Sequence, residues 1–76
     1  MNNARRKQLD KIISKIEVTK NDLESVLADE EEYRDNMPEN LQSSERYERA
    51  ESAVSELESA IDCIDDVISS IEAAQE

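Results

Sequence analysis

The strongest constraint on this chain is a run of four consecutive heptads in its second half. Between Tyr47 and Ile71, apolar residues follow alternating steps of three and four without a break. The core positions of these heptads are Tyr47, Val54, Ile61 and Ile68 at a, and Ala50, Leu57, Ile64 and Ile71 at d. Small apolar residues also recur every seven residues at position g, namely Ala53, Ala60, Val67 and Ala74. This pattern is typical of a long helix that buries one stripe against another helix.

The first half carries a second helical stripe, which is broader. Its members alternate in the same steps and are Leu9, Ile12, Ile16, Thr19, Leu23, Val26, Glu30 and Tyr33. Ile13 and Leu27 lie beside it at the next position, so the stripe is about three positions wide. Lys20 interrupts the stripe, and two interpretations of it stay open. Its charge either fixes the register of two helices, or its stem snorkels along apolar surface.

A turn region separates the two stripes. Pro38 disfavours a helical Met37 and has no backbone donor, so the first helix should end before it. Ser43 or Ser44 can cap the second helix. We expect residues 1–76 to form one domain, with a helix over 4–34, a bend over 35–43 and a helix over 44–75. Two helices of equal length with a short connection form an antiparallel hairpin.

Two helices can hide only one narrow seam, and both stripes here are wider than that. The chain has one cysteine and no histidine, so an internal disulfide or a Cys/His metal staple is excluded. We therefore predict an all-α homo-oligomer, most simply a dimer of hairpins that forms a four-helix bundle. The expected self-association core is Leu9, Ile13, Ile16, Leu23, Leu27, Val54, Leu57, Ile61, Ile64, Ile68 and Ile71.

The composition argues against catalysis. Without glycine there is no Gly-rich phosphate loop, and without histidine there is no Ser-His-Asp triad. Asp62, Asp65 and Asp66 fall on the outer face of the second helix, where a solvated face is a better explanation than a metal site. Cys63 lies away from the seam with no base near it, so we expect an inert thiol. We expect a non-enzymatic protein without metal or cofactor.

The formal charge of −11 is unevenly distributed. Residues 1–20 carry six bases and two acids, whereas residues 21–51 carry eleven acids and three bases. Negative charge argues against direct binding to nucleic acid or to an anionic membrane. No apolar run approaches the ~20 residues of a membrane span, and no signal-peptide core follows the basic N-terminus, so we expect a cytoplasmic protein.

The acids around the bend suggest a contact surface for a basic partner. The candidate partner-binding residues are Asp29, Glu30, Glu31, Glu32, Asp35, Glu39, Glu45, Glu48 and Glu51. A structural explanation stays open beside this one, because the basic N-terminus of a second hairpin could cover the same acids, or water could simply solvate them.

Two stretches resemble a known group of proteins. Asp35–Gln42, followed by Ser44–Glu48 and Glu51, is similar to a motif in small acidic helical proteins of bacteria, their phages and conjugative elements, and the opening Arg5–Leu9 resembles theirs too. The resemblance runs over the whole chain. It implies a bacterial or mobile-element origin and supplies no catalytic residues.

Three functions follow as hypotheses. The first is a helical hairpin that modulates a bacterial or phage protein by binding it. The second is a DNA mimic that inhibits a nucleic-acid-binding protein, since rows of carboxylates can imitate phosphate charge. The third is a structural module that assembles only with itself.

Overall fold

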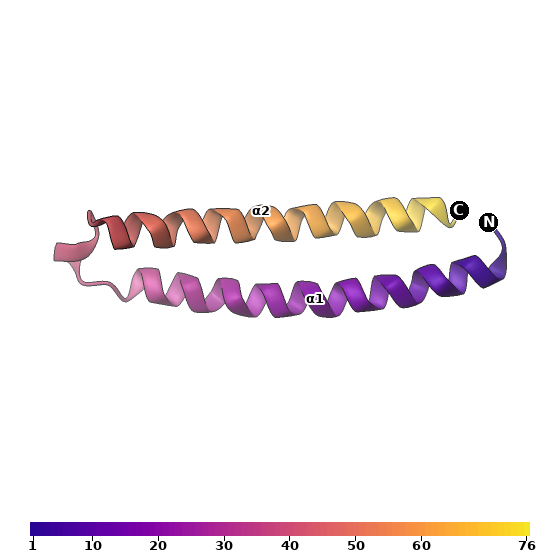
Figure 1. Ribbon diagram of the computed structural model, residues 1–76, viewed down its shortest axis with the longest axis horizontal. Helices are drawn as coiled ribbons and strands as arrows, with labels where there is room; N and C mark the ends of the chain where they lie inside the picture. The colour runs from indigo at the N-terminus through magenta and orange to yellow at the C-terminus, as the bar shows by residue number, and fades with distance from the viewer.

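The computed structural model describes all 76 residues and consists of two long helices. Helix α1 spans Asn3–Asp35, helix α2 spans Glu45–Ala74, and a short 3-10 turn, η1, spans Glu39–Leu41 between them. The two helices lie side by side and antiparallel, with both termini at one end and the bend at the other (Figure 1). The molecule is a rod with extents of 59 × 15 × 12 Å. The predicted all-α fold of two packed helices is confirmed.

Local chemistry sets the ends of the helices. The Asn2 side chain caps α1 by accepting a hydrogen bond from the Arg5 backbone N–H at 2.8 Å. Pro38 is extended, with φ −59° and ψ 149°, and leads directly into η1. Of the two serines considered as caps, Ser44 is the N-cap of α2, because its hydroxyl oxygen accepts from the Tyr47 N–H at 3.3 Å. The observed bounds of both helices lie within one residue of the expected ones.

The seam between the helices follows heptads in both of them. In α1 the less exposed side chains recur at alternating steps of three and four, which defines a and d positions for this helix as well. The a positions of α1 are Arg6, Ile13, Lys20, Leu27 and Arg34, and its d positions are Leu9, Ile16, Leu23 and Glu30. Near the termini, the Arg6 guanidinium donates from Nε to the Gln75 carbonyl oxygen at 3.0 Å. This contact and the bend place Leu23 level with Leu57, and Leu27 level with Val54.

The α1 seam differs from the predicted stripe at every second turn. The expected members Ile12, Thr19, Val26 and Tyr33 are exposed, and their neighbours Ile13, Lys20, Leu27 and Arg34 face α2 instead. Two physical reasons favour this choice. Leu27 buries more apolar area than Val26 would. Lys20 can lay its aliphatic stem in the seam while its ammonium group reaches water and a carboxylate.

Burial is complete only near the bend. Met37, Ala50 and Val54 are the three buried residues of the chain. Every other residue of the expected self-association core is half-buried along the contact between α1 and α2. The seam is therefore fully shielded from water only near the bend and is partly open along the rest of its length. Neither helix has a stretch long and apolar enough to cross a membrane.

Because one valine lies in the seam and another on the surface, replacing each by alanine should change the free energy of unfolding in opposite directions. Val54 is only 4% exposed, so Val54→Ala should lower the free energy of unfolding by about 1–2 kcal/mol through lost burial and a small cavity. Val18 is 60% exposed on α1, so Val18→Ala should raise it by a few tenths of a kcal/mol, because alanine is the better helix former. Thermal unfolding followed by circular dichroism at one protein concentration measures both. Equal effects of the two substitutions would contradict the described seam.

Candidate functional site

Antiparallel pairing gives the two broad sides of the hairpin different chemistry. In such a pair, the residues at position g of one helix lie beside those at g of the other, and the residues at e lie beside those at e. In both helices the g positions are mostly apolar and the e positions are all acidic. The rod therefore has one apolar side and one acidic side.

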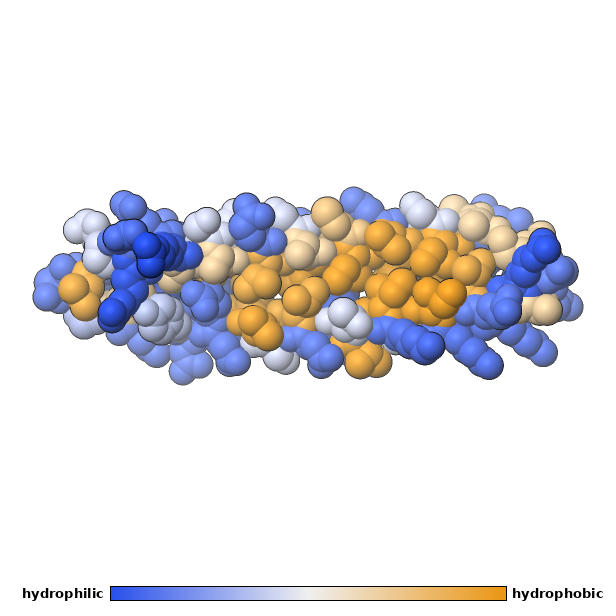
Figure 2. All heavy atoms as spheres, viewed as in Figure 1, coloured by the Kyte–Doolittle hydropathy of each residue, from blue (hydrophilic) through white to orange (hydrophobic).

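The apolar face consists of g residues from both helices, namely Ile12, Thr19, Val26 and Tyr33 of α1 and Ala53, Ala60, Val67 and Ala74 of α2. Its four largest apolar side chains are between 43% and 52% exposed. Tyr33 and Ala53 border one shallow depression, so the two rows share a side of the hairpin. Figure 2 shows hydrophobic atoms of both helices gathered along the middle of one broad side for most of its length. This is open apolar surface without a partner in the monomer.

The acidic face lies on the opposite side. Its members are Asp10, Glu17, Glu24 and Glu31 of α1 and Glu51, Glu58, Asp65 and Glu72 of α2. Lys20 relieves their repulsion at one level, because its Nζ lies 2.6 Å from Asp65 Oδ1 and 3.8 Å from Glu24 Oε1. The hydrogen bond to Asp65 raises the pKa of Lys20 above its usual value. The charge of Lys20 thus joins α1 to α2, while its stem lies in the seam.

The acidic bend is the set of nine carboxylates predicted to bind a partner, and the structure places all nine at the bend end of the rod. They come from the last two turns of α1, from η1 and from the first two turns of α2. Glu30 and Glu31 are half-buried, with Glu30 in the seam, and the other seven are exposed.

Internal pairing neutralises little of this charge. Arg34 Nε lies 3.0 Å from Asp35 Oδ1, and this hydrogen bond raises the pKa of Arg34. Arg49 pairs with Glu45 on the exposed surface of α2. Arg46 makes no ion pair. Seven of the nine carboxylates therefore have no cationic partner within the chain.

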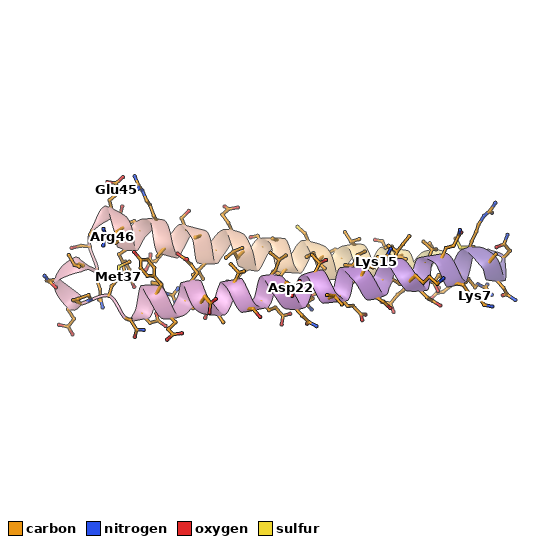
Figure 3. The ribbon with its side chains drawn as sticks, turned by 60° about the horizontal axis from the view of Figure 1, so that its bottom comes forward. Lys7, Lys15, Asp22, Met37, Glu45 and Arg46 are labelled. Atoms are coloured by element: carbon orange, nitrogen blue, oxygen red, sulfur yellow. The ribbon has the colours of Figure 1, made fainter.

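A shallow depression of about 470 Å³ lies at the bend. Its lining combines apolar side chains with charged ones and consists of Asp29, Glu32, Tyr33, Asn36, Met37, Pro38, Leu41 and Arg46. Met37 and Arg46 lie together at the bend, and Glu45 projects away from the rod (Figure 3). Such a surface can hold a cationic side chain by its charge and by its aliphatic stem. It offers no nucleophile paired with a base.

Residues singled out elsewhere lie apart from this region. Cys63 is a free, exposed thiol on α2. Asp62, Asp65 and Asp66 are exposed, and no three potential metal ligands of the chain converge on one point. The sequence interpretation missed the acidic face, although an acid every seven residues in both helices was the signal for it.

Comparisons of the chain with protein-family models, with curated proteins and with solved structures found no match.

Tyr47 reports on the packing beside the acidic bend. It occupies an a position of the seam and is half-buried. Desolvation raises the pKa of Tyr47 above its ordinary value near 10, and the neighbouring Glu51 carboxylate raises it further, whereas Arg34 opposes the shift. Because the folded state holds the phenol proton more tightly than the unfolded chain does, this contribution to stability is complete below pH 10. It is lost as the pH rises through the folded pKa.

This shift predicts a measurable titration. In a Tyr33→Phe variant, Tyr47 is the one remaining tyrosine, and its phenolate absorbance should show a midpoint above 10 when folded and near 10 in urea. Adding Glu51→Gln should move the folded midpoint down, because a repelling carboxylate is removed. A folded midpoint at or below the value in urea would show that Tyr47 does not lie in the seam.

Proposed function

We propose that this chain is a non-enzymatic helical hairpin that acts by binding another protein through its acidic bend. The observation that carries the proposal is the uncompensated charge there, since seven of nine carboxylates have no cationic partner. In keeping with the resemblance of its sequence, we propose that it modulates a bacterial protein from within the cytoplasm and is encoded by a bacterium, phage or mobile element.

The bend suits such a contact because it is the most firmly packed part of the rod. All three buried residues lie at this end, so the carboxylates border the best-buried part of the hairpin. A basic surface on the partner would supply the missing counter-charges and would be steered toward the bend during encounter. The apolar residues lining the depression, Tyr33, Met37 and Leu41 among them, add contact area for the stem of a lysine or arginine.

The acidic face supports a second candidate, the DNA mimic. Its carboxylates form two rows, and within each row they recur about every 10 Å along the helix axis. Only Lys20 interrupts the repulsion between the rows. A protein with a positive groove for nucleic acid could bind such a rod lengthwise.

We also propose that the hairpin associates with itself. The half-buried seam and the open apolar face both support this, because an unpartnered pair of helices shields its apolar side chains poorly. A dimer of hairpins would form a four-helix bundle with the apolar face inside and the acidic face outside.

The bend contact can be tested by reversing charge. Glu31→Lys, Glu32→Lys and Asp35→Lys together should abolish capture of a partner from a bacterial lysate by the immobilised protein, because the partner surface is expected to be basic. Capture by the wild type should also weaken as salt rises, since exposed charges are screened within about 8 Å at physiological ionic strength.

A matched control reverses three acids far from the bend. Glu17→Lys, Glu58→Lys and Glu72→Lys make the same change in net charge, and all three are exposed residues of the acidic face. If the partner contacts the bend, this control keeps capture. If the control abolishes capture and the bend variant does not, the acidic face is the contact and a basic nucleic-acid-binding protein is the expected prey. Full capture by both variants would refute a role for either charged surface.

A further inference from the structure

We propose that the apolar face is covered by a second copy of this chain that runs in the opposite direction. In this arrangement the bend of one hairpin lies over the termini of the other, and α1 packs on α1. A twofold axis passes through the level of Thr19 and Ala60. The inference rests on the self-association proposed above and adds the orientation of the two copies.

The apolar face is complementary to itself under this rotation. Along α1, Ile12 and Val26 lie seven residues on either side of Thr19, so reversing one copy sets each isoleucine against a valine. Along α2, Ala53 and Val67 flank Ala60 in the same way, which sets a small residue against a larger one. In the register set by the contact of Arg6 with Gln75, Thr19 is level with Asp62, two residues from Ala60, so one axis passes within about 3 Å of the centre of both rows. Pairing of small with large residues is what close packing requires.

Charge along the edge of this face has the same symmetry. Position c adjoins g on the helix surface, and the c residues nearest the centre of α1 are Lys15 and Asp22. Both are exposed, and neither makes an ion pair within the chain. They are one heptad apart, so they lie on the same side of α1. Reversal of one copy brings Lys15 of each hairpin against Asp22 of the other, which gives two ion pairs per dimer.

A dimer with both bends at the same end lacks this complementarity. It would stack α1 on α2 and set Asp22 near Glu56 of the second copy, with Lys15 near the uncharged Cys63. It would also place two acidic bends together, where like charges repel. The opposed arrangement keeps the bends at opposite ends of a rod that is 59 Å long. The broad side measures 59 × 15 Å, an outline of the same order as the roughly 800 Å² per partner that a standard stable interface buries.

The ion pairs between copies can be tested by a charge swap. Lys15→Glu alone, or Asp22→Lys alone, replaces two attractive pairs by two repulsive ones and should raise the dimer dissociation constant at least tenfold. An equal mixture of the two variants should regain wild-type association, because each chain then offers the charge that the other lacks. Sedimentation equilibrium measures the dissociation constants of the two variants and of their equal mixture. Lys7→Glu, on the outer surface of α1, makes the same charge change as Lys15→Glu and should raise the dissociation constant much less.

The outcomes separate the orientation from self-association itself. A wild-type chain that stays monomeric at high micromolar concentration overturns both. A wild-type dimer whose affinity is unchanged in either variant, or is not restored in the mixture, overturns the opposed arrangement alone. Neither residue belongs to the acidic bend, and no lysate partner is needed, so these results are independent of the bend contact.

Cross-linking gives a second measurement of orientation. In a Cys63→Ser background, Thr19→Cys places thiols beside the proposed axis, and oxidation should link two copies of this one variant efficiently. With both bends at the same end, Thr19 would face Ala60 of the second copy instead. Preferential linkage between Thr19→Cys and Ala60→Cys chains, with little self-linkage of either, would therefore overturn the proposal.

Discussion

Antiparallel pairing of two heptad helices brings like positions together, and the other surfaces of this molecule depend on that constraint. The seam takes a and d, which leaves e beside e and g beside g along the whole rod. Since e is acidic and g mostly apolar in both helices, the sequence sorts its remaining side chains onto two opposite sides without any further element. A parallel pair would have mixed acidic and apolar residues on each side.

The same constraint explains why so few residues are buried. Two helices in contact enclose a single line of side chains, and each of these keeps one flank open to water. Only near the bend, where Met37, Ala50 and Val54 are buried, are side chains enclosed. Elsewhere even Leu23 and Leu57, which lie at one level, stay half-exposed. The missing cover must come from outside the chain, or the hairpin remains marginally stable.

Much of this architecture could be predicted from the sequence, because it depends on local chemistry. The unbroken heptads of α2, Pro38 and the Ser44 cap each act over a few residues. The α1 seam could not be predicted so easily, because Ile12 and Ile13, or Val26 and Leu27, are adjacent and either member of each pair could face inward. One of the two reasons for the choice is Lys20, whose partner Asp65 is distant in sequence and becomes its neighbour only after the chain has turned back. The nine acids of the bend could be predicted as a group, but not that Glu30 would lie in the seam.

The opposed dimer and the acidic bend fit together in one physical argument. Each chain carries a formal charge of −11, so association must overcome the repulsion between two acidic rods. Reversing one copy lowers that cost, because the basic first turns of each α1 approach the acidic last turns of the other. It also sets the two bends roughly 50 Å apart, several Debye lengths at physiological ionic strength, so each bend binds as if the other were absent. A dimer of this kind presents two equivalent acidic ends, and a partner that is itself multivalent would gain avidity only if its sites match that separation.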